Sequence, residues 1–467
     1  MTKKVIKKLF VFVALLLPVY AFAEGGAQNP SINGIRIEFI LFAMTLIGVA
    51  VFHKHTFWVA VTGLVLILLY KIIFVSAYPF ADHFFGENSI IEQLTNKDMR
   101  QGEWGILLNL LGLLLGFALL AKIFEESGIP DILPRYLPDD WKGPMLLLIF
   151  VFILSSFLDN IAAAMIGGAI AIVVFKNRVH VGYIAGIVAA SNAGGAGSVV
   201  GDTTTTMMWI DGVSAINVLH AFVASGVAIF IVAWFASHQQ DKYQRIIADP
   251  KPDIKIDWVR LLIVIMILAG AILSNIYYDM PALGVWIAIF IGAFMRKMPW
   301  QEMKASVKGS IFLLCLVTSA SLMPVETLPS ASWMSAFILG FVSAVFDNIP
   351  LTKLCLEQGH YDWGMLAYAV GFGGSMVWFG SSAGVAISNK FQDARDVMLW
   401  IRKGWHVTFA YIAGFFVLLI IMGWEPADNK AHKEPAITCT AKDCKAREDA
   451  KMLELLNNIP IDSNTVK

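Results

Sequence analysis

The sequence predicts an all-α polytopic membrane protein, built from inverted structural repeats that contain broken helices and re-entrant hairpins. Three observations support this fold class. Of the 467 residues, 57% are hydrophobic and only 15% are charged, a balance that is rare in a soluble domain of this length. An Asp-Asn pair interrupts an apolar segment in each half of the chain, and a glycine-rich stretch follows each pair. Irregular backbone persists at membrane depth only where protein or a water-filled cavity surrounds it.

The first residues have the layout of a secretory signal peptide. Four lysines within the first eight residues precede an apolar run over residues 9–17, and Ala21-Phe22-Ala23 forms an A-x-A cleavage site. We predict a cleavable signal peptide over residues 1–23, and the alternative is an uncleaved first membrane span. The polar tail of residues 424–467 is expected to lack a core. Cys439 and Cys444 would form a disulfide there if the tail is periplasmic.

Residues 24–101 are predicted to form an N-terminal helical hairpin and a periplasmic loop. Arg36–Phe52 and Phe57–Val75 are each apolar enough to span a bilayer, and only a short polar link joins them. The following loop, Tyr78–Glu103, carries more acidic than basic residues. This charge balance favours the outer side of the membrane.

The first transport repeat is assigned to residues 102–237. Trp104–Phe124 predicts one span, and Pro144–Phe175 is an apolar segment of 32 residues. Because about 20 residues suffice to cross a bilayer, we expect a break or a strong tilt near Asp159. Met207–Ser237 then predicts a long returning span.

Residues 238–308 are predicted to be cytoplasmic loops joined by a helical hairpin, Trp258–Tyr277 with Leu283–Met295. The loops on either side of that hairpin are basic, which places them in the cytoplasm. The second transport repeat is assigned to residues 309–423. Its predicted spans are Ile311–Leu322, Trp333–Phe346 and Trp405–Met422.

The two repeats share an order of features. Asp159-Asn160 is echoed by Asp347-Asn348, and the pattern Gly-Gly-x5-Gly recurs downstream of each pair. The stretch Ser191–Trp209 is read as the tip of a broken or re-entrant segment that lines a transport site. We expect the repeats to be inverted, the glycine stretches to enter from opposite faces, and the site to lie at the repeat interface near the midplane. The predicted loop residues are Ser191, Gly194, Gly195, Gly201, Gly373, Gly374, Gly380 and Ser381.

Asp159 and Asp347 are the strongest single signals of function. An ionisable residue at the bilayer centre costs about 2.5 to 3.5 kcal/mol on insertion scales, so such residues usually mark ion pathways. The alternative is that each carboxylate only caps a half-helix, or that Asp347 pairs with Lys353. Asp202 has the same two interpretations, capping or ion binding, and we expect one or two of the threonines in Thr203–Thr206 to be ligands.

Several quoted motifs resemble one known family. LDN, SNAGGAGSVVGDTTTTMMWI, FDNIPL and GFGGSMVWFGSSAGVA resemble the NhaD-type sodium:proton antiporters of the ion transporter superfamily, which also holds citrate, dicarboxylate and arsenite carriers. The similarity runs over about residues 102–422. It implies exchange of Na⁺ or Li⁺ for protons through intramembrane carboxylates. The matching cation- and proton-binding positions are Asp159, Asn160, Asn192, Asp202, Thr204, Thr205, Asp347 and Asn348, with Asp159, Asp202 and Asp347 as the expected Na⁺ ligands.

The chain departs from that family at two places. Members often have LDNLTTT where this chain has Ile161 and three alanines after the first Asp-Asn pair, so hydroxyl ligands are missing there. They often have GGAWSPIGDVTT where this chain has Gly197, Val199 and Thr203. Both differences affect which ion is bound.

The leading prediction is therefore a secondary cation:proton antiporter, not an enzyme, in a bacterial inner membrane. The runner-up is a cation-coupled carrier of citrate or another small carboxylate, and a membrane sensor is a third class, although no folded cytoplasmic domain is visible in the sequence. A formal net charge of zero argues against a nucleic-acid partner. No nucleotide motif is found, and we expect no cofactor beyond the transported ions. The oligomeric state stays open, a homodimer included.

Overall fold

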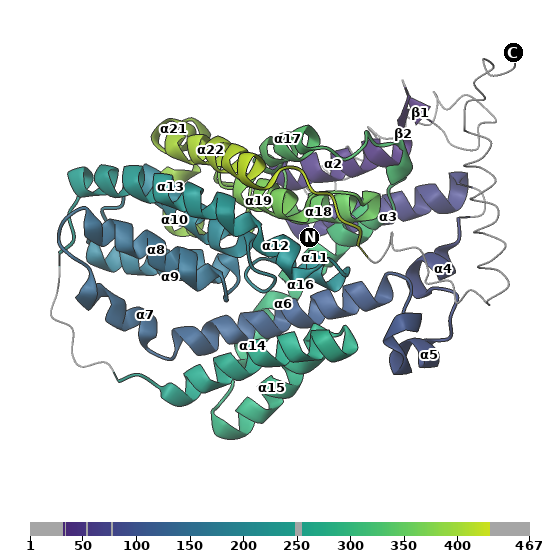
Figure 1. The fold of residues 1–467 in the computed structure, drawn as a ribbon, viewed down its shortest axis with the longest axis horizontal. Coiled ribbons are helices and arrows are strands. Elements are labelled where there is room, and N and C mark those ends of the chain that lie inside the picture. Colours follow the sequence, from purple (N-terminus) through teal and green to yellow (C-terminus); the bar gives the residue numbers. More distant parts are fainter. Residues whose placement is uncertain (1–30, 33, 53–54, 76–77, 248–254, 430–467) are drawn as a thin grey trace, which may run out of the picture.

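In the computed structural model, the described residues are 31–32, 34–52, 55–75, 78–247 and 255–429. They form a bundle of helices with one short antiparallel ribbon, β1 (Ser31–Ile32) and β2 (Ile35–Arg36) (Figure 1). Within these ranges, six helical segments are long and apolar enough to cross a membrane: Thr56–Phe74, Trp104–Glu125, Ala215–Tyr243, Trp258–Tyr278, Trp300–Ser321 and Trp405–Met422. The predicted all-α, multi-pass membrane fold is thus confirmed. The predicted signal peptide and Cys439 and Cys444 lie outside the described residues.

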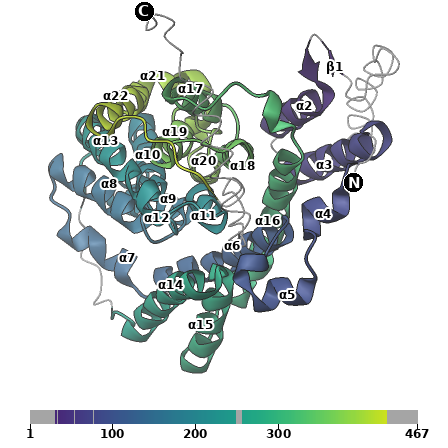
Figure 2. The ribbon, with the colours of Figure 1, turned by 45° about the vertical axis from the view of Figure 1, so that its right-hand side comes forward.

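The helices fall into two packed groups. The first, the α6 group, holds α6 and the helices that pack around it or around α16, with three short helices at one end (Figure 2). Its members are α2 (Ile37–Val51), α3 (Thr56–Phe74), α4 (Phe80–Phe85), α5 (Ile90–Thr95), η2 (Lys97–Met99), α6 (Trp104–Glu125), α14 (Trp258–Tyr278), α15 (Pro281–Met295) and α16 (Trp300–Ser321).

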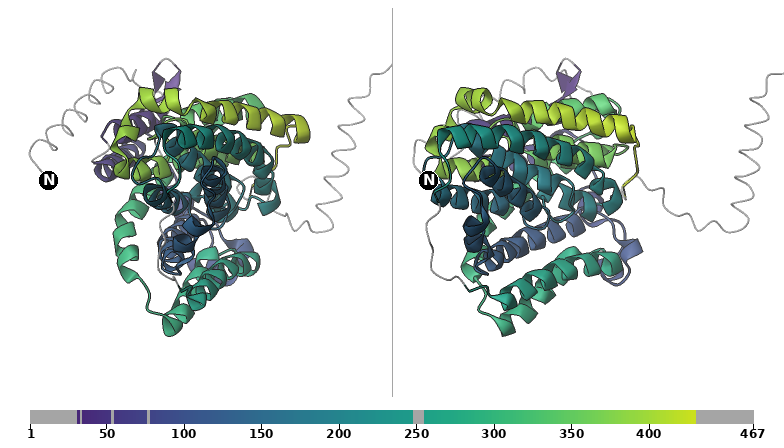
Figure 3. Two further views of the ribbon diagram at one scale, coloured as in Figure 1. Left: turned by 90° about the vertical axis from the view of Figure 1, so that its left-hand side faces the viewer. Right: turned by 60° about the vertical axis from the view of Figure 1, so that its left-hand side comes forward.

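The second, the hairpin group, contains both predicted repeats except for their first helices. Its long helices α13 (Ala221–Tyr243) and α22 (Trp405–Met422) run in roughly the same direction as α6 and α14 (Figure 3, right). Its members are α7 (Ile129–Ile132), η3 (Leu133–Tyr136), α8 (Lys142–Ser155), α9 (Asn160–Val174), α10 (Val181–Ala196), α11 (Thr203–Ile210), α12 (Ala215–Leu219), α13 (Ala221–Tyr243), α17 (Trp333–Ser343), α18 (Asn348–Gln358), α19 (Trp363–Gly373), α20 (Ser382–Lys390), η5 (Gln392–Arg395), α21 (Val397–Lys403) and α22 (Trp405–Met422). The short η4 (Val325–Thr327) connects α16 to α17.

The 32-residue apolar segment around Asp159 folds back on itself as the hairpin α8–α9. The Tyr183 hydroxyl at the start of α10 donates to the Pro144 carbonyl at the start of α8 (2.8 Å). The Ile247 N–H, after α13, donates to the Val174 carbonyl at the end of α9 (2.9 Å). Because the Gln240 side chain joins the end of α13 to His180 before α10 (2.8 Å), both ends of the hairpin lie at one end of the molecule. The chain therefore reverses direction at Asp159. The sequence predicted either a break or a strong tilt at this position.

The second hairpin, α17–α18, enters from the opposite end. The Gln358 side chain at the end of α18 donates to the Pro329 carbonyl, just before α17 (2.6 Å). The open end of this hairpin lies beside the end of α22. Trp363, which follows α18 at the start of α19, donates its indole N–H to the Ala427 carbonyl just after α22 (2.6 Å). The start of α22 instead packs near α10 and α21. The two hairpins thus have the opposite orientations that inverted repeats require.

The glycine-rich stretches are breaks in two-part helices, so Ser191–Trp209 is a broken segment and not a re-entrant one. As expected, the two stretches are reached from opposite ends: α10 begins at the end where Gln240 of α13 lies, and α19 begins at the end where Ala427 lies. Ser191–Ala196 is helical, and the first break covers only residues 197–202. A Cβ atom on Gly194 would overlap the Phe152 carbonyl oxygen, and one on Gly373 would overlap that of Gly340. Phe152 and Gly340 each lie seven residues before the aspartate of their hairpin tip, so the same close approach recurs in both repeats.

Two predicted spans were wrong in their bounds. The helix expected over Ile311–Leu322 begins eleven residues earlier, at Trp300, so α16 includes a charged first half. The expected continuous span Met207–Ser237 is divided into α11, α12 and α13, with a turn at Gly212, whose φ is +88°. A left-handed backbone angle of this size ends a helix and favours glycine.

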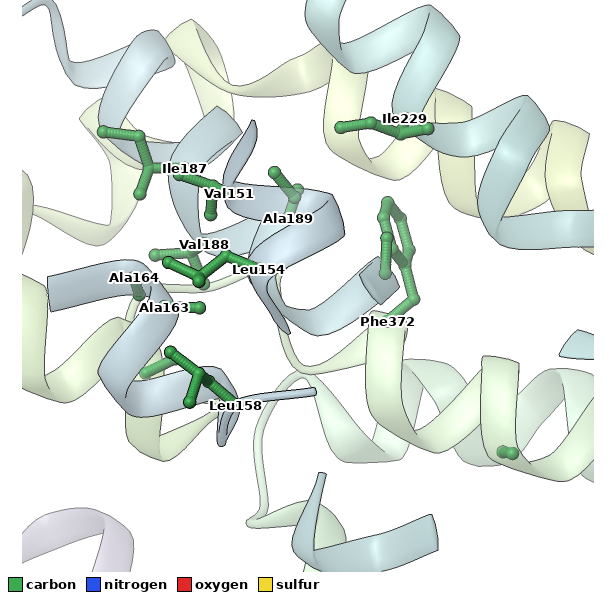
Figure 4. Packing of buried hydrophobic residues seen from close by; sticks show 14 of the residues in the cluster. Val151, Leu154, Leu158, Ala163, Ala164, Ile187, Val188, Ala189, Ile229 and Phe372 are labelled. Atoms are coloured by element: carbon green, nitrogen blue, oxygen red, sulfur yellow. The ribbon is translucent and has the colours of Figure 1, made fainter. Parts of the chain in front are cut away.

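The main hydrophobic core is centred on the hairpin group and extends into α6, α14, α15 and α16. Figure 4 shows Val151 and Leu154 of α8, Ala163 and Ala164 of α9, and Ile187 of α10 meeting at the first hairpin. Small residues on α9 and α10 let the helices approach closely. Helices in a lipid bilayer commonly pack in this way, because the hydrophobic effect does not drive their association there. This packing fixes the positions of the hairpin tip and of the neighbouring helix break.

Candidate functional site

The three intramembrane aspartates each cap the N-terminus of a half-helix. Asp159 accepts from the Ile161 N–H (3.1 Å) at the start of α9. Asp347 accepts from the Ile349 N–H (3.0 Å) at the start of α18. Asp202 accepts from the Thr204 N–H (3.3 Å) at the start of α11. Capping, the alternative role considered for each, is therefore present, and each carboxylate keeps a second oxygen for another partner.

Amides and hydroxyls connect the tips to the breaks. The Asn160 side chain donates to Asn192 Oδ1 (3.1 Å), and Asn192 donates to Ser375 Oγ in the second break (2.9 Å). Asn192 is fully buried. Asn348 donates to Asp202 Oδ2 (3.4 Å), and the Ser382 hydroxyl bonds Asp347 Oδ2 (3.3 Å). Both hairpin tips and both helix breaks thus meet in one polar network.

This network borders a cavity of about 370 Å³ between the two helix groups. The α6 group contributes residues 110–121 of α6 and residues 302–313 of α16. The hairpin group contributes the tips and breaks. The polar lining comes from Asp159, Asn160, Asp202, Thr203, Thr206, Glu302, Ser306, Ser310, Asn348 and Ser382. A chamber bounded by half-helix ends at a repeat interface is the arrangement found in secondary transporters.

The predicted site residues divide into two sets. Asp159, Asn160, Asp202 and Asn348 line the cavity. The lining does not include Asn192, which is one hydrogen bond behind Asn160, or Asp347, which is bonded to the lining residue Ser382.

The threonines that line the cavity are not the ones that the family resemblance implied. Thr204 and Thr205 are buried and do not line the cavity, whereas Thr203 and Thr206 do. The Thr205 hydroxyl donates to the Ser198 carbonyl (2.6 Å) and so stabilises the turn of the break. One helical turn carries four threonines, and only those on one face can reach the cavity.

The predicted loop residues have packing roles. Ser191 donates to the Val188 carbonyl of its own helix (2.9 Å). Gly195 and Gly374 occupy equivalent places, each beside the carbonyl of the glycine that ends its break, Gly201 or Gly380. Ser381 caps α20 through the Gly384 N–H (3.2 Å). The glycines therefore let the broken helices approach the hairpins closely, and Gly194 and Gly201 make the closest approaches.

The three aspartates are in electrostatic contact in series, Asp159 with Asp202 and Asp202 with Asp347. They do not form one compact cluster: across the described ranges, no three His, Cys, Asp or Glu side chains are close enough to hold one metal ion. Their side-chain partners are the Asn348 amide at Asp202 and the Ser382 hydroxyl at Asp347, and amide and hydroxyl groups carry oxygens that hard cations accept as ligands.

A second cavity of about 530 Å³ adjoins the first and shares Ala118, Ala121, Ala162 and Glu302 with it. Its charged lining comes from Lys122, Glu125, Glu126, Asp131, Glu302 and Lys390. It lies at the end of α6 that holds Glu126, where Arg260 at the start of α14 pairs with Glu126 (2.8 Å). The basic loops predicted to be cytoplasmic lie at this same end. The two cavities together lead from the network toward that end.

Sequence reasoning missed the contribution of α16. Glu302, Ser306 and Ser310 line the cavity at a spacing of four residues, one face of a helix. The charged first half of this helix suggested a loop, although the polar residues at helical spacing were a usable signal. Ser375 and Ser382 were also missed. Each directly follows a predicted loop residue, Gly374 or Ser381.

Lys353 does not pair with Asp347, which was the alternative considered for that aspartate. Its ammonium pairs with Glu103 at the start of α6 (2.9 Å) and with Glu357 one turn along α18 (2.6 Å). Six residues separate Lys353 from Asp347, which places the two side chains on different faces of α18. The lysine therefore belongs to a separate ionic cluster nearer the end of the molecule opposite the cavities.

Three of the four half-helix N-termini at the centre are capped by carboxylates, Asp159, Asp202 and Asp347, and the fourth by Ser381. A bare helix N-terminus attracts anions because its N–H groups are unpaired and its dipole is positive there. Here acidic side chains occupy those positions and supply negative charge. The arrangement suits a cation or a proton better than an anion.

Comparison with known proteins agrees with this chemistry. A model of the citrate transporter family matches residues 39–371. Sodium/proton antiporter 1 of Arabidopsis thaliana is 28% identical over 318 residues, with 58% of this chain and 54% of that protein covered. The Na(+)/H(+) antiporter NhaD of Alkalimonas amylolytica is 26% identical, with 59% and 68% covered. The one of Vibrio cholerae is 25% identical, with 50% and 61% covered. The chain thus spans about half the length of the plant relative.

Proposed function

The chain belongs to the citrate transporter family, and from this premise we propose that it exchanges Na⁺ or Li⁺ for protons; the names of its antiporter relatives describe sodium/proton exchange. The observation that carries the proposal is the capping of three central half-helices by Asp159, Asp202 and Asp347. Carboxylates bind either a proton or a cation, and both cannot occupy the same oxygens at once. Competition at these side chains therefore couples the two fluxes.

Asp202 is the proposed centre of that competition. It borders the cavity, is in electrostatic contact with both other aspartates, and accepts from Asn348 of the second repeat. A cation that enters from the cavity would meet Asp202, Asn348 and the hydroxyls of Thr203 and Thr206. When Asp202 takes up a proton, it loses the negative charge that holds the cation. The proton and the cation then leave in opposite directions across the membrane.

The proposed location is the bacterial inner membrane, with the Glu126 end of α6 facing the cytoplasm. The basic loops around α14 and α15 lie at that end, and basic loops stay inside. The named relatives come from both bacteria and a plant.

The second candidate is a cation-coupled carrier of citrate or a similar carboxylate. The description of the matching family favours it, as does the fourth half-helix N-terminus, where neutral Ser381 caps α20. Such an anion would have to be accompanied by cations, because the other three N-termini carry carboxylates.

Proton flux in everted membrane vesicles separates the two candidates. A pH gradient is formed by respiration, and Na⁺, Li⁺, K⁺ and citrate are added in turn. We expect Na⁺ or Li⁺ to dissipate the gradient and citrate alone to leave it intact, in vesicles with this protein but not in vesicles without it. A response to citrate that requires Na⁺, with none to Na⁺ alone, would replace antiport by carboxylate transport.

A further inference from the structure

We propose that the buried ion pair between Lys353 and Glu103 is a latch that closes one end of the interface between the two helix groups while the cavity is open toward the other end. This proposal rests on the proposed function in one respect: a transported ion must reach its site from both sides in turn. The pair itself and its position are read from the structure.

The pair joins the two groups directly. Glu103 is the residue that precedes α6, and Lys353 belongs to α18, the second arm of the second hairpin. The Lys353 ammonium lies 2.9 Å from both Glu103 carboxylate oxygens, and Lys353 is only 1% exposed. A charged pair this well buried holds its partners in one arrangement, because separating them would leave an unpaired charge in an apolar surrounding.

The position along α6 sets the pair apart from the cavities. Residues 110–121 of α6 line the first cavity and residues 118–126 border the second, so both lie toward the Glu126 end. Glu103 lies at the opposite end, about 10 Å before Leu110 at the helical rise of 1.5 Å per residue. The interface between the groups is therefore hollow toward one end and joined by charges at the other.

The neighbours of the pair strengthen the junction on the hairpin side. Glu357 of α18 pairs with Lys353 as well (2.6 Å), and Asp211 at the end of α11 acts on the same ammonium electrostatically. The Asn429 side chain donates to both Asp211 and the Leu356 carbonyl, which ties α11 to α18. Lys353 is thus fixed to the hairpin group by several contacts and to the α6 group through Glu103. Opening a path past this end requires the pair between Lys353 and Glu103 to separate.

The test uses cysteine labelling from each side of the membrane. In a background without the native cysteines, Ser306→Cys reports access to the cavity from the Glu126 end, and Leu110→Cys reports access from the Glu103 end. Each reporter is combined with Glu103→Gln or Lys353→Met. A membrane-impermeant maleimide is added to everted vesicles for the first reporter and to right-side-out vesicles for the second.

We expect loss of the pair to shift the population toward the state that is open at the Glu103 end. Labelling of Leu110→Cys should rise by about tenfold and labelling of Ser306→Cys should fall, which is the direction of a two-state shift. Lys353→Arg keeps the charge and should label like the parent. Asp257→Asn is the matched control, because it removes an ion pair with Arg296 that lies within the α6 group (3.0 Å).

The proposal is overturned if Lys353→Met and Glu103→Gln label at the parent rates from both sides, or if Asp257→Asn gives the same shift. If Lys353→Met does not reach the membrane, the double variant Glu103→Gln/Lys353→Met is labelled in its place. Neither partner of the pair is charged in that variant, so parent labelling rates there overturn the proposal. The labelling needs no ion transport, so its result does not depend on whether the protein is an antiporter. Parallel flux measurements on the parent protein test the antiport itself.

Discussion

The Asn348 side-chain amide donates to Asp202 Oδ2 across 3.4 Å, and this bond joins the tip of the second hairpin to the helix break of the first repeat. The two residues are 146 positions apart in the sequence. Asp202 is also the aspartate in electrostatic contact with both others. A change of charge at Asp202 therefore changes the electrostatic potential at the aspartates of both repeats.

Replacing Asp202 by Asn should abolish Na⁺-dependent proton flux without unfolding the protein. Asparagine caps a helix about as well as aspartate, so α11 keeps its N-cap. The charge that binds the cation is lost, and a fall in flux of at least tenfold corresponds to about 1.4 kcal/mol of binding. Flux in everted vesicles, normalised to protein in the membrane, is the measurement. Activity near the parent level would move the exchange site away from Asp202.

Replacing Asn192 by Ala should weaken both stability and Na⁺ affinity. The amide bridges Asn160 and Ser375, and its loss leaves buried polar groups without partners, at a cost of about 1 to 3 kcal/mol. Thermal unfolding in detergent and the KM for Na⁺ are measured together. Ser237→Ala is the control, because Ser237 bonds only its own helix at Trp234. An Asn192→Ala protein with parent stability and KM would show that the bridge is dispensable.

Replacing Gly194 by Ala should destabilise the protein, whereas Gly226→Ala should not. A Cβ on Gly194 overlaps the Phe152 carbonyl, and overpacking of this kind costs about 1 to 3 kcal/mol. Gly226, inside α13, has no atom within 4 Å of the added Cβ. Alanine there should stabilise by roughly 0.5 to 1 kcal/mol, the usual helix preference over glycine. Equal Tm values for the two variants would contradict the close packing of α8 against α10.

The charge of Asp257 should contribute to stability at neutral pH and not in acid. A hydrogen bond from Arg296 holds the pKa of this exposed carboxyl below its usual range. A lowered folded-state pKa means that the contribution is present above the unfolded pKa of about 3.9 and is lost as pH falls through the folded value. Asp257→Asn keeps the cap of α14 but loses the charge. Its Tm should be slightly below the parent's at pH 7 and should converge on it as the pH falls through the lowered folded-state pKa; a gap that persists below that pKa would rule out the ion pair as its cause.

Much of the helical layout could be predicted from hydrophobicity. The helix over Trp405–Met422 was predicted to the residue, and both Asp-Asn pairs were expected to interrupt their segments. The fold-back of the first hairpin could not be deduced, because a long apolar segment either tilts or reverses, and only its contacts with α10 and α13 decide. The start of α16 was missed because Lys304 and Lys308 look like a cytoplasmic loop although they lie on a helix.

The site was partly predictable for a related reason. Charged and amide side chains in apolar segments stand out locally, so Asp159, Asn160, Asp202 and Asn348 could be named before their positions were known. Pairings over long distances leave no such signal. The sequence offered Asp347 as an alternative partner for Lys353, whereas its partner Glu103 is 250 positions away. The face of the threonine run that meets the cavity also depends on packing and cannot be read from four consecutive threonines.

Proton release from the purified protein on addition of Na⁺ tests the central claim most directly, since it measures competition without transport. The protein is held in weak buffer with a pH-sensitive dye, and NaCl is added at several starting pH values, with choline chloride as the salt control. The account predicts release of protons by Na⁺, a half-saturating Na⁺ concentration that rises as the starting pH falls, and no release from Asp202→Asn. Stabilisation of the protein by Na⁺ with no proton released at any pH would contradict it.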